Sequence, residues 1–126
     1  MNKLVWCAVW CVVALGLTGC GALVDLAGVE TASAHCDFRE RGPNGPENRC
    51  QERVEVIKQG VESFKGLCAS LGAVSGDGPC PREGVVGGCF IGEQGDGSDV
   101  NDWYYAPMTR EQAQGKCASR EPFLEP

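Results

Sequence analysis

The chain contains one histidine, His35, and none of the common catalytic signatures. It has no Gly-x-Ser-x-Gly motif, no glycine-rich phosphate loop and no second histidine that would complete a catalytic triad. Beyond Cys20, no two cysteines are closer than nine residues, and Cys-x-x-Cys pairs, which are typical of zinc sites, do not occur. We therefore expect no enzyme activity, no catalytic residues, no cofactor and no bound metal.

Positive charge is also scarce. The chain has 11 Lys and Arg residues against 17 Asp and Glu residues, a net charge of −6. Nucleic-acid binding needs concentrated basic side chains, so the charge balance argues against it. An acidic chain is compatible with a basic protein partner.

Long apolar runs are limited to the N-terminus. Leu4 to Leu17 form an apolar run of 14 residues that follows Lys3. Because a membrane-spanning helix needs about 20 apolar residues, the run is too short to span a bilayer, but it is typical of a secretory signal peptide. The segment could be an ordinary secretory signal in which Cys20 occurs by chance. The other interpretation is a lipid anchor at Cys20.

The run ends in Leu17-Thr18-Gly19-Cys20, which resembles the lipobox of bacterial lipoproteins. The resemblance implies a signal peptide at residues 1–19 and a mature protein that begins at Cys20, lipid-modified on its thiol and acylated, for example with palmitate, on its amine. Two or three acyl chains make such a membrane anchor effectively permanent. Gly21 replaces the aspartate that retains many such lipoproteins in the inner membrane, which implies the outer membrane, on its periplasmic or surface face.

The cysteine count fits an exported domain. Of nine cysteines, Cys7 and Cys11 lie in the signal peptide and Cys20 would be lipidated. An even six remain, which predicts three disulfides formed in an oxidising compartment. The six are Cys36, Cys50, Cys68, Cys80, Cys89 and Cys117.

The remaining pattern predicts a small disulfide-rich α+β domain over residues 35–126, held by a tether at residues 20–34 that is partly helical at 22–27. We expect a strand at 36–40, a turn at 41–48 and a helix whose apolar positions run from Val54 to Leu71 at steps of three and four. Two apolar runs, 85–91 and 100–106, predict a β-hairpin. Thr109 and Gln112 predict a capping box for a last helix that carries Ala113 and Cys117 on one face.

The two halves of the domain have similar patterns. Residues 35–81 and 82–126 each contain a strand with a cysteine, a turn, a strand and a helix that ends in Cys-Ala-Ser. If the chain is duplicated, each unit closes its own strand-to-helix disulfide, which gives Cys36–Cys68 and Cys89–Cys117 and leaves Cys50–Cys80. Six cysteines allow 15 pairings, so this connectivity is a hypothesis, and a single α+β domain without repeats is its alternative.

Three features suggest a site, and each has a simpler structural interpretation. The acidic segment 93–102 offers oxygen ligands for calcium, but a solvated hairpin turn explains it as well. Trp103, Tyr104 and Tyr105 form either an aromatic ligand platform or the core of a small sheet. His35 lies beside Cys36, but an oxidised cysteine is no thiolate nucleophile.

The segment Val86-Gly87-Gly88-Cys89, the aromatic run Trp103-Tyr104-Tyr105, and Ala113 with Cys117 resemble a recurring pattern in small cysteine-rich lipoproteins of Gram-negative bacteria, many of them uncharacterised. The resemblance implies no activity. We therefore expect a non-enzymatic envelope lipoprotein that acts as an interaction or structural module. The alternative is an inhibitor or binder of a basic envelope or host enzyme.

Overall fold

A computed structural model describes residues 28–126. The predicted signal peptide, the lipid-modified Cys20 and the helical part of the tether lie outside the described residues. From residue 28 onward, no helix is both long enough and apolar enough to cross a membrane.

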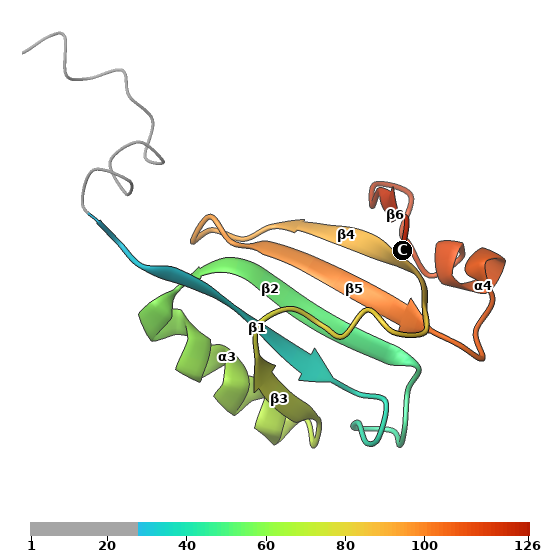
Figure 1. Cartoon of the computed structure of the whole chain (residues 1–126), viewed down its shortest axis with the longest axis horizontal. Coiled ribbons are helices and arrows are strands. Elements are labelled where there is room, and N and C mark those ends of the chain that lie inside the picture. Colours follow the sequence, from blue (N-terminus) through green and yellow to red (C-terminus); the bar gives the residue numbers. More distant parts are fainter. Residues whose placement is uncertain (1–27) are drawn as a thin grey trace, which may run out of the picture.

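The domain is a six-stranded antiparallel sheet with two helices in the described part of the chain, so the predicted α+β class is confirmed (Figure 1). The strands follow the order β3-β1-β2-β5-β4-β6 across the sheet. The elements are β1 (Thr31–Asp37), β2 (Arg49–Ile57), α3 (Lys58–Ser70), β3 (Val74–Asp77), β4 (Val85–Glu93), β5 (Asp99–Tyr105), α4 (Arg110–Gln114) and β6 (Phe123–Leu124).

The order of the elements repeats. Strands β1 and β2, helix α3 and strand β3 form a first unit, and strands β4 and β5, helix α4 and strand β6 form a second unit with the same order. The two units also have the same strand order when each is followed from its edge of the sheet to the centre. The first unit runs β3-β1-β2 and the second runs β6-β4-β5, so β2 and β5 meet at the centre. The two units are therefore related by an approximate two-fold axis between β2 and β5.

The register of the strands locates this axis. One row of paired residues crosses all six strands, and its two cysteines are placed symmetrically about a central pair from β2 and β5. The row is Ser75, Cys36, Gln51, Asp102, Cys89 and Phe123. The approximate axis passes through the pair Gln51 and Asp102.

The three disulfides have the predicted pairing: Cys36–Cys68, Cys50–Cys80 and Cys89–Cys117. The first and third occupy equivalent places in the two units, since each joins the first strand of a unit to its helix or to the turn that follows the helix. The second joins β2 to the segment after β3. In the chain-entropy model, closing loops of about 30 residues contributes roughly 3 to 4 kcal/mol each.

The buried apolar side chains of residues 28–126 form three clusters. One lies under α3 and is made entirely of residues of the first unit, including Phe38, Val56 and Phe64. Another, around Cys89, Tyr104 and Ala113, lies under α4 and is made entirely of residues of the second unit. The third lies on the opposite face and is shared by both units: Cys50, Cys80, Trp103 and Tyr105, with Val85 and Leu124 at its margin.

The predicted helix began too early. Val54 and Ile57 belong to strand β2, and α3 begins at Lys58. The register of β2 against β1 shifts between Arg53 and Val56, where Glu55 has a φ of 60°. A bulge breaks the two-residue alternation of a strand. Val54 and Ile57 are therefore three residues apart, which is the spacing of one face of a helix.

Other predicted boundaries also shift. Strand β1 starts at Thr31, so residues 31–34 belong to the sheet and not to the tether, and the strand ends at Asp37 instead of residue 40. The short strands β3 and β6 were not predicted, because four and two residues show no clear period. The hairpin of β4 and β5 is confirmed.

Thr109 and Gln112 form the predicted capping box of α4. The helix ends at Gln114, so Cys117 lies in the following turn.

Candidate interaction surface

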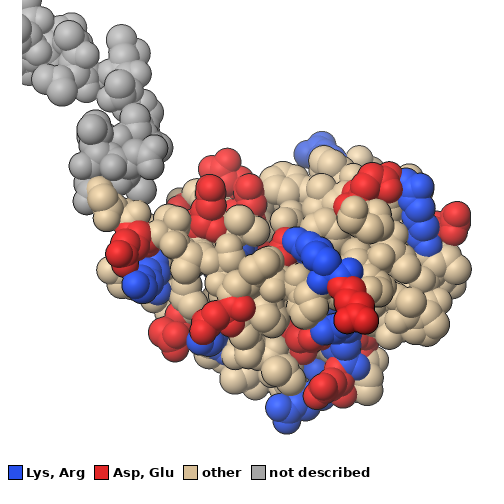
Figure 2. Space-filling model, viewed as in Figure 1, with Lys and Arg blue, Asp and Glu red and all other residues tan. Residues whose placement is uncertain are grey.

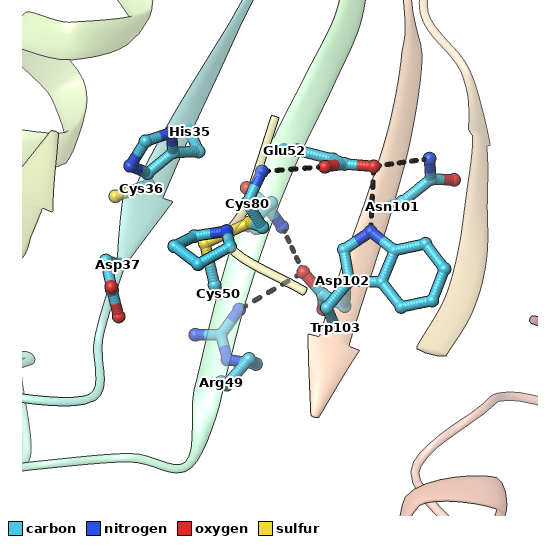
Figure 3. Close-up of a disulfide and its surroundings, with 12 residues drawn as sticks. His35, Cys36, Asp37, Arg49, Cys50, Glu52, Cys80, Asn101, Asp102 and Trp103 are labelled. Atoms are coloured by element: carbon cyan, nitrogen blue, oxygen red, sulfur yellow. Dashed lines mark hydrogen bonds and ion pairs between the residues drawn. A yellow bond between two sulfur atoms is a disulfide. The ribbon is translucent and has the colours of Figure 1, made fainter. Parts of the chain in front are cut away.

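Glu52 on β2 is the largest fully buried side chain, although it is charged (1% exposed). Its carboxylate accepts hydrogen bonds from Trp103 Nε1 (2.7 Å) and from the backbone N–H of Cys80 (2.9 Å). Arg82 (3.0 Å) and Asn101 (3.2 Å) donate as well, as Figure 3 shows for all but Arg82. Every lone-pair direction of the carboxylate is thus used within the protein, so Glu52 is a structural residue that joins β2, β5 and the segment after β3.

The surroundings of Glu52 favour its charged form. Burial alone would raise the pKa of Glu52, but the hydrogen bonds from Trp103, Arg82 and Cys80 outweigh burial and lower the pKa below its usual value. The guanidinium of Arg82 also covers the Trp103 ring, with its central carbon 3.9 Å from the ring centroid.

Asp102 lies on the face of the sheet that the helices cover, and its pKa shifts in the opposite direction from that of Glu52. Burial raises the pKa of Asp102, and the opposing effects of Arg49 and Gln51 do not compensate for it. Gln51 Nε2 donates to Asp102 Oδ1 at 2.9 Å, and Arg49 Nη1 lies 3.5 Å from the same oxygen (Figure 3). The neighbouring Tyr104 is also buried, which raises its pKa to about 12.

The aromatic run Trp103, Tyr104 and Tyr105 is core, with exposed fractions of 3 to 7%. Trp103 and Tyr105 face the shared cluster, while Tyr104 faces α4. Arg39 covers the Tyr105 ring at 4.3 Å. The rings are therefore covered and do not form an open platform for a ligand.

The acidic segment 93–102 does not converge on a point. Asp96 accepts hydrogen bonds from the backbone and hydroxyl of Ser98, and Arg53 pairs with it at 3.4 Å. Asp102 and Asn101 point to opposite faces of the sheet, toward Gln51 and Glu52 respectively. Within residues 28–126, no group of three or more His, Cys, Asp or Glu side chains could hold a metal ion.

His35 is a structural residue of β1. Its Nδ1 lies 3.0 Å from the carbonyl oxygen of Gly78, and its ring packs against Gly76 of β3, where a Cβ would lie 2.5 Å from the imidazole. Cys36 is oxidised in the disulfide to Cys68. The pair His35 and Cys36 therefore has no free thiol.

The connection from β3 to β4 crosses the sheet: the Gly78 N–H donates to Ser33 O (2.8 Å) near the start of β1, whereas Pro81 O accepts from the Tyr105 hydroxyl at the end of β5. We call three segments the distal surface: residues 38–48, the last part of this connection at 81–84, and 106–109. They lie at the end where β1 and β5 finish and β2 and β4 begin, whereas β1 starts at the other end (Figure 1). Six residue steps at about 3.3 Å place the two ends of β1 roughly 20 Å apart.

The connections are tied to one another and to the sheet. The backbone N–H of Tyr105 donates to Asn48 O (3.0 Å), and that of Ala106 donates to Gly84 O (3.0 Å). The Tyr105 hydroxyl donates to Pro81 O at 2.6 Å. The disulfide Cys50–Cys80 joins β2 to the residue immediately before the segment 81–84.

The tips of these connections are exposed. Four of the seven prolines lie in them, which limits the conformations of the backbone. Since a surface that is already ordered loses little entropy on binding, such loops suit recognition of a protein partner. The exposed residues include Arg41, Pro43, Asn44, Pro46, Pro81, Arg82, Glu83 and Gly84.

A shallow pocket of about 410 Å³ opens beside this surface, between the connection 38–48 and the segments that flank α4. Arg49 and Tyr104 line it from the two central strands, and Met108 and Lys116 line it from the second unit. Pro46, Glu47 and Asn48 complete the wall. The pocket therefore has walls from both units.

Acidic and basic groups are interspersed on the face that Figure 2 shows. Several acidic and basic side chains of the described residues pair with one another. Arg39 binds both oxygens of Asp37 through its guanidinium, for example. The sequence indicated the turn at 41–48, but it gave no signal that this connection meets the segments 81–84 and 106–109 at one end of the sheet.

No protein-family model, no curated protein and no solved structure matches this chain.

Proposed function

We propose that this protein is a lipid-anchored lipoprotein of the bacterial envelope and that it binds a protein partner through its distal surface, without catalysis. The single observation that supports the binding role is that the three exposed segments of the distal surface gather at the end of the sheet opposite the start of β1. An anchor at Cys20 would then hold the protein on the membrane with this surface directed away from it.

The structural roles of the polar groups agree with a binding module. Glu52, Asp96 and Asp102 all have partners within the protein, and the aromatic rings are covered. The side chains at the tips of the connections are exposed, so they are the groups that a partner would meet first.

Site-specific photo-crosslinking in the native envelope tests the binding surface. A photoreactive residue at Asn44 or at Glu83 should give the same discrete crosslinked product. At Gly95, in the exposed turn between β4 and β5 at the other end of the sheet, it should give none. Equal products from all three positions, or none from Asn44 and Glu83, would contradict the proposed surface.

The anchor has a separate test. Intact mass measurement of the purified protein should show a lipid-modified N-terminus at Cys20, and Cys20→Ser should release the protein from the membrane fraction. A wild-type chain without acyl groups would refute the anchor while leaving the crosslinking result valid.

A further inference from the structure

Each unit has most of what a separate folding unit needs. The cluster under α3 and the cluster under α4 are each built from one unit alone. Each unit also closes its own strand-to-helix disulfide, and in the described part of the chain no disulfide joins one unit to the other. The covalent connection between the units is the segment 81–84, which is exposed along its whole length.

The contact between the units is a sheet seam flanked by polar side chains. Strands β2 and β5 pair over six residues, from Arg49 with Tyr104 to Val54 with Asp99. On the helix side, Gln51 and Arg49 reach Asp102, and Arg53 Nη2 donates to Ser98 Oγ at 3.0 Å. On this face, the contact resembles the polar interfaces between separately folded parts.

The other face adds one shared apolar cluster. Trp103 and Tyr105 of the second unit pack there against the disulfide Cys50–Cys80 of the first. Glu52 accepts from Trp103 and Asn101 across the same seam. These contacts have a definite geometry, so each unit presents a surface complementary to the other.

We propose that the β2–β5 seam is an interaction surface that opens, and that the first unit of one copy binds the second unit of another copy. The partner is thus a second copy of this chain. The contacts formed between copies would be the same as those within one copy, because only the connection 81–84 differs between the two arrangements.

A cleavable connection tests the proposal in the whole folded protein. A recognition sequence for a specific protease is inserted between Glu83 and Gly84 of the chain without its signal peptide, and the purified protein is cut after its disulfides have formed. The control carries the same insertion between Gly95 and Asp96, where Cys89–Cys117 keeps the fragments joined. Both positions are exposed.

Cut protein labelled with ¹⁵N is then mixed with an equal amount of unlabelled cut protein, and native mass spectrometry follows the complexes. Hybrid pairs of one heavy and one light unit should rise to about half of all complexes, as mass action requires for free exchange. The control should give none. Persistence of unmixed pairs, or loss of folded structure on cutting, would overturn the proposal.

Hydrogen exchange of the uncut, unmodified chain provides a second measurement that does not depend on the insertion. The amides that pair β2 with β5 should exchange at least about tenfold faster than those that pair β1 with β2, because opening of the seam leaves each unit intact. Equal protection of both pairs of strands would contradict a separable seam.

Discussion

Replacing Glu52 with glutamine should destabilise the protein strongly, although the two side chains have nearly the same shape. The carboxylate accepts from Trp103, Cys80, Arg82 and Asn101, and it has no donor of its own when ionised. A glutamine would place an amide NH₂ group against these donors. It would also leave the guanidinium of Arg82 without its carboxylate.

The expected loss is about 3 kcal/mol at pH 7. Hydrogen bonds to a charged group contribute roughly 1.5 to 3 kcal/mol each, and Glu52→Gln disrupts those at one of the two oxygens. The contribution of Arg82 is discounted because its side chain is 47% exposed. Urea denaturation followed by circular dichroism should show a midpoint lower by about 1.5 M, for a slope of about 2 kcal/mol per M.

The loss should depend on pH in a defined direction. The pKa of Glu52 is lowered in the folded protein from a reference of 4.5, so above that value the folded and unfolded states are both ionised and the full stabilisation is present. As the pH falls through the lowered folded pKa, the carboxylate becomes protonated and the stabilisation is lost. The difference between wild type and Glu52→Gln should therefore shrink below about pH 4.5.

Glu93→Gln serves as a control, because Glu93 is exposed at the end of β4. It should change the stability by less than about 0.5 kcal/mol. A loss below about 1 kcal/mol for Glu52→Gln at pH 7, or a loss that stays constant down to pH 2, would refute the role of the charge.

Three further changes have definite outcomes. Because burial raises the folded pKa of Asp102, ionisation of this side chain weakens the fold as the pH rises through that pKa; Asp102→Asn should therefore raise the melting temperature at pH 7, an advantage that thermal melting should find absent below about pH 3.8. The double change Cys89→Ala and Cys117→Ala should cost about 3 to 4 kcal/mol in urea titrations, and a cost near zero would show that this loop closure is unimportant. Gly88→Ala places a Cβ 2.7 Å from both Asp102 O and Trp103 Cε3, and it should lower the melting temperature far more than Gly95→Ala, whose Cβ meets no atom within 4 Å.

Much of the fold follows from local signals in the sequence. The turn residues at 41–48, the capping box at Thr109 and the apolar runs of β4 and β5 each have a short-range physical cause, and the structure contains all of them. The disulfide pairing agrees with the hypothesis of a duplicated unit, in which equivalent cysteines of two equivalent units close equivalent bridges.

The rest depends on contacts that are remote in the sequence. The bulge at Glu55 exists only because β2 pairs with β1 on one side and continues into α3, so a single-strand pattern could not reveal it. Glu52 has the appearance of a surface residue in the sequence. Its burial becomes clear only when Trp103 and Cys80, 51 and 28 residues away, lie against it.

The candidate surface and the proposed seam are physically connected. The pocket beside the distal surface takes Arg49 from the first unit, and Met108 and Lys116 from the second. A partner seated there would contact both units and would bind only while the seam is closed, so its binding would stabilise the closed arrangement by mass action. By reciprocity, whatever opens the seam must weaken binding of the partner. In the cut protein, therefore, saturation with the partner should slow the exchange of units, whereas a partner that binds one unit alone should leave the exchange rate unchanged.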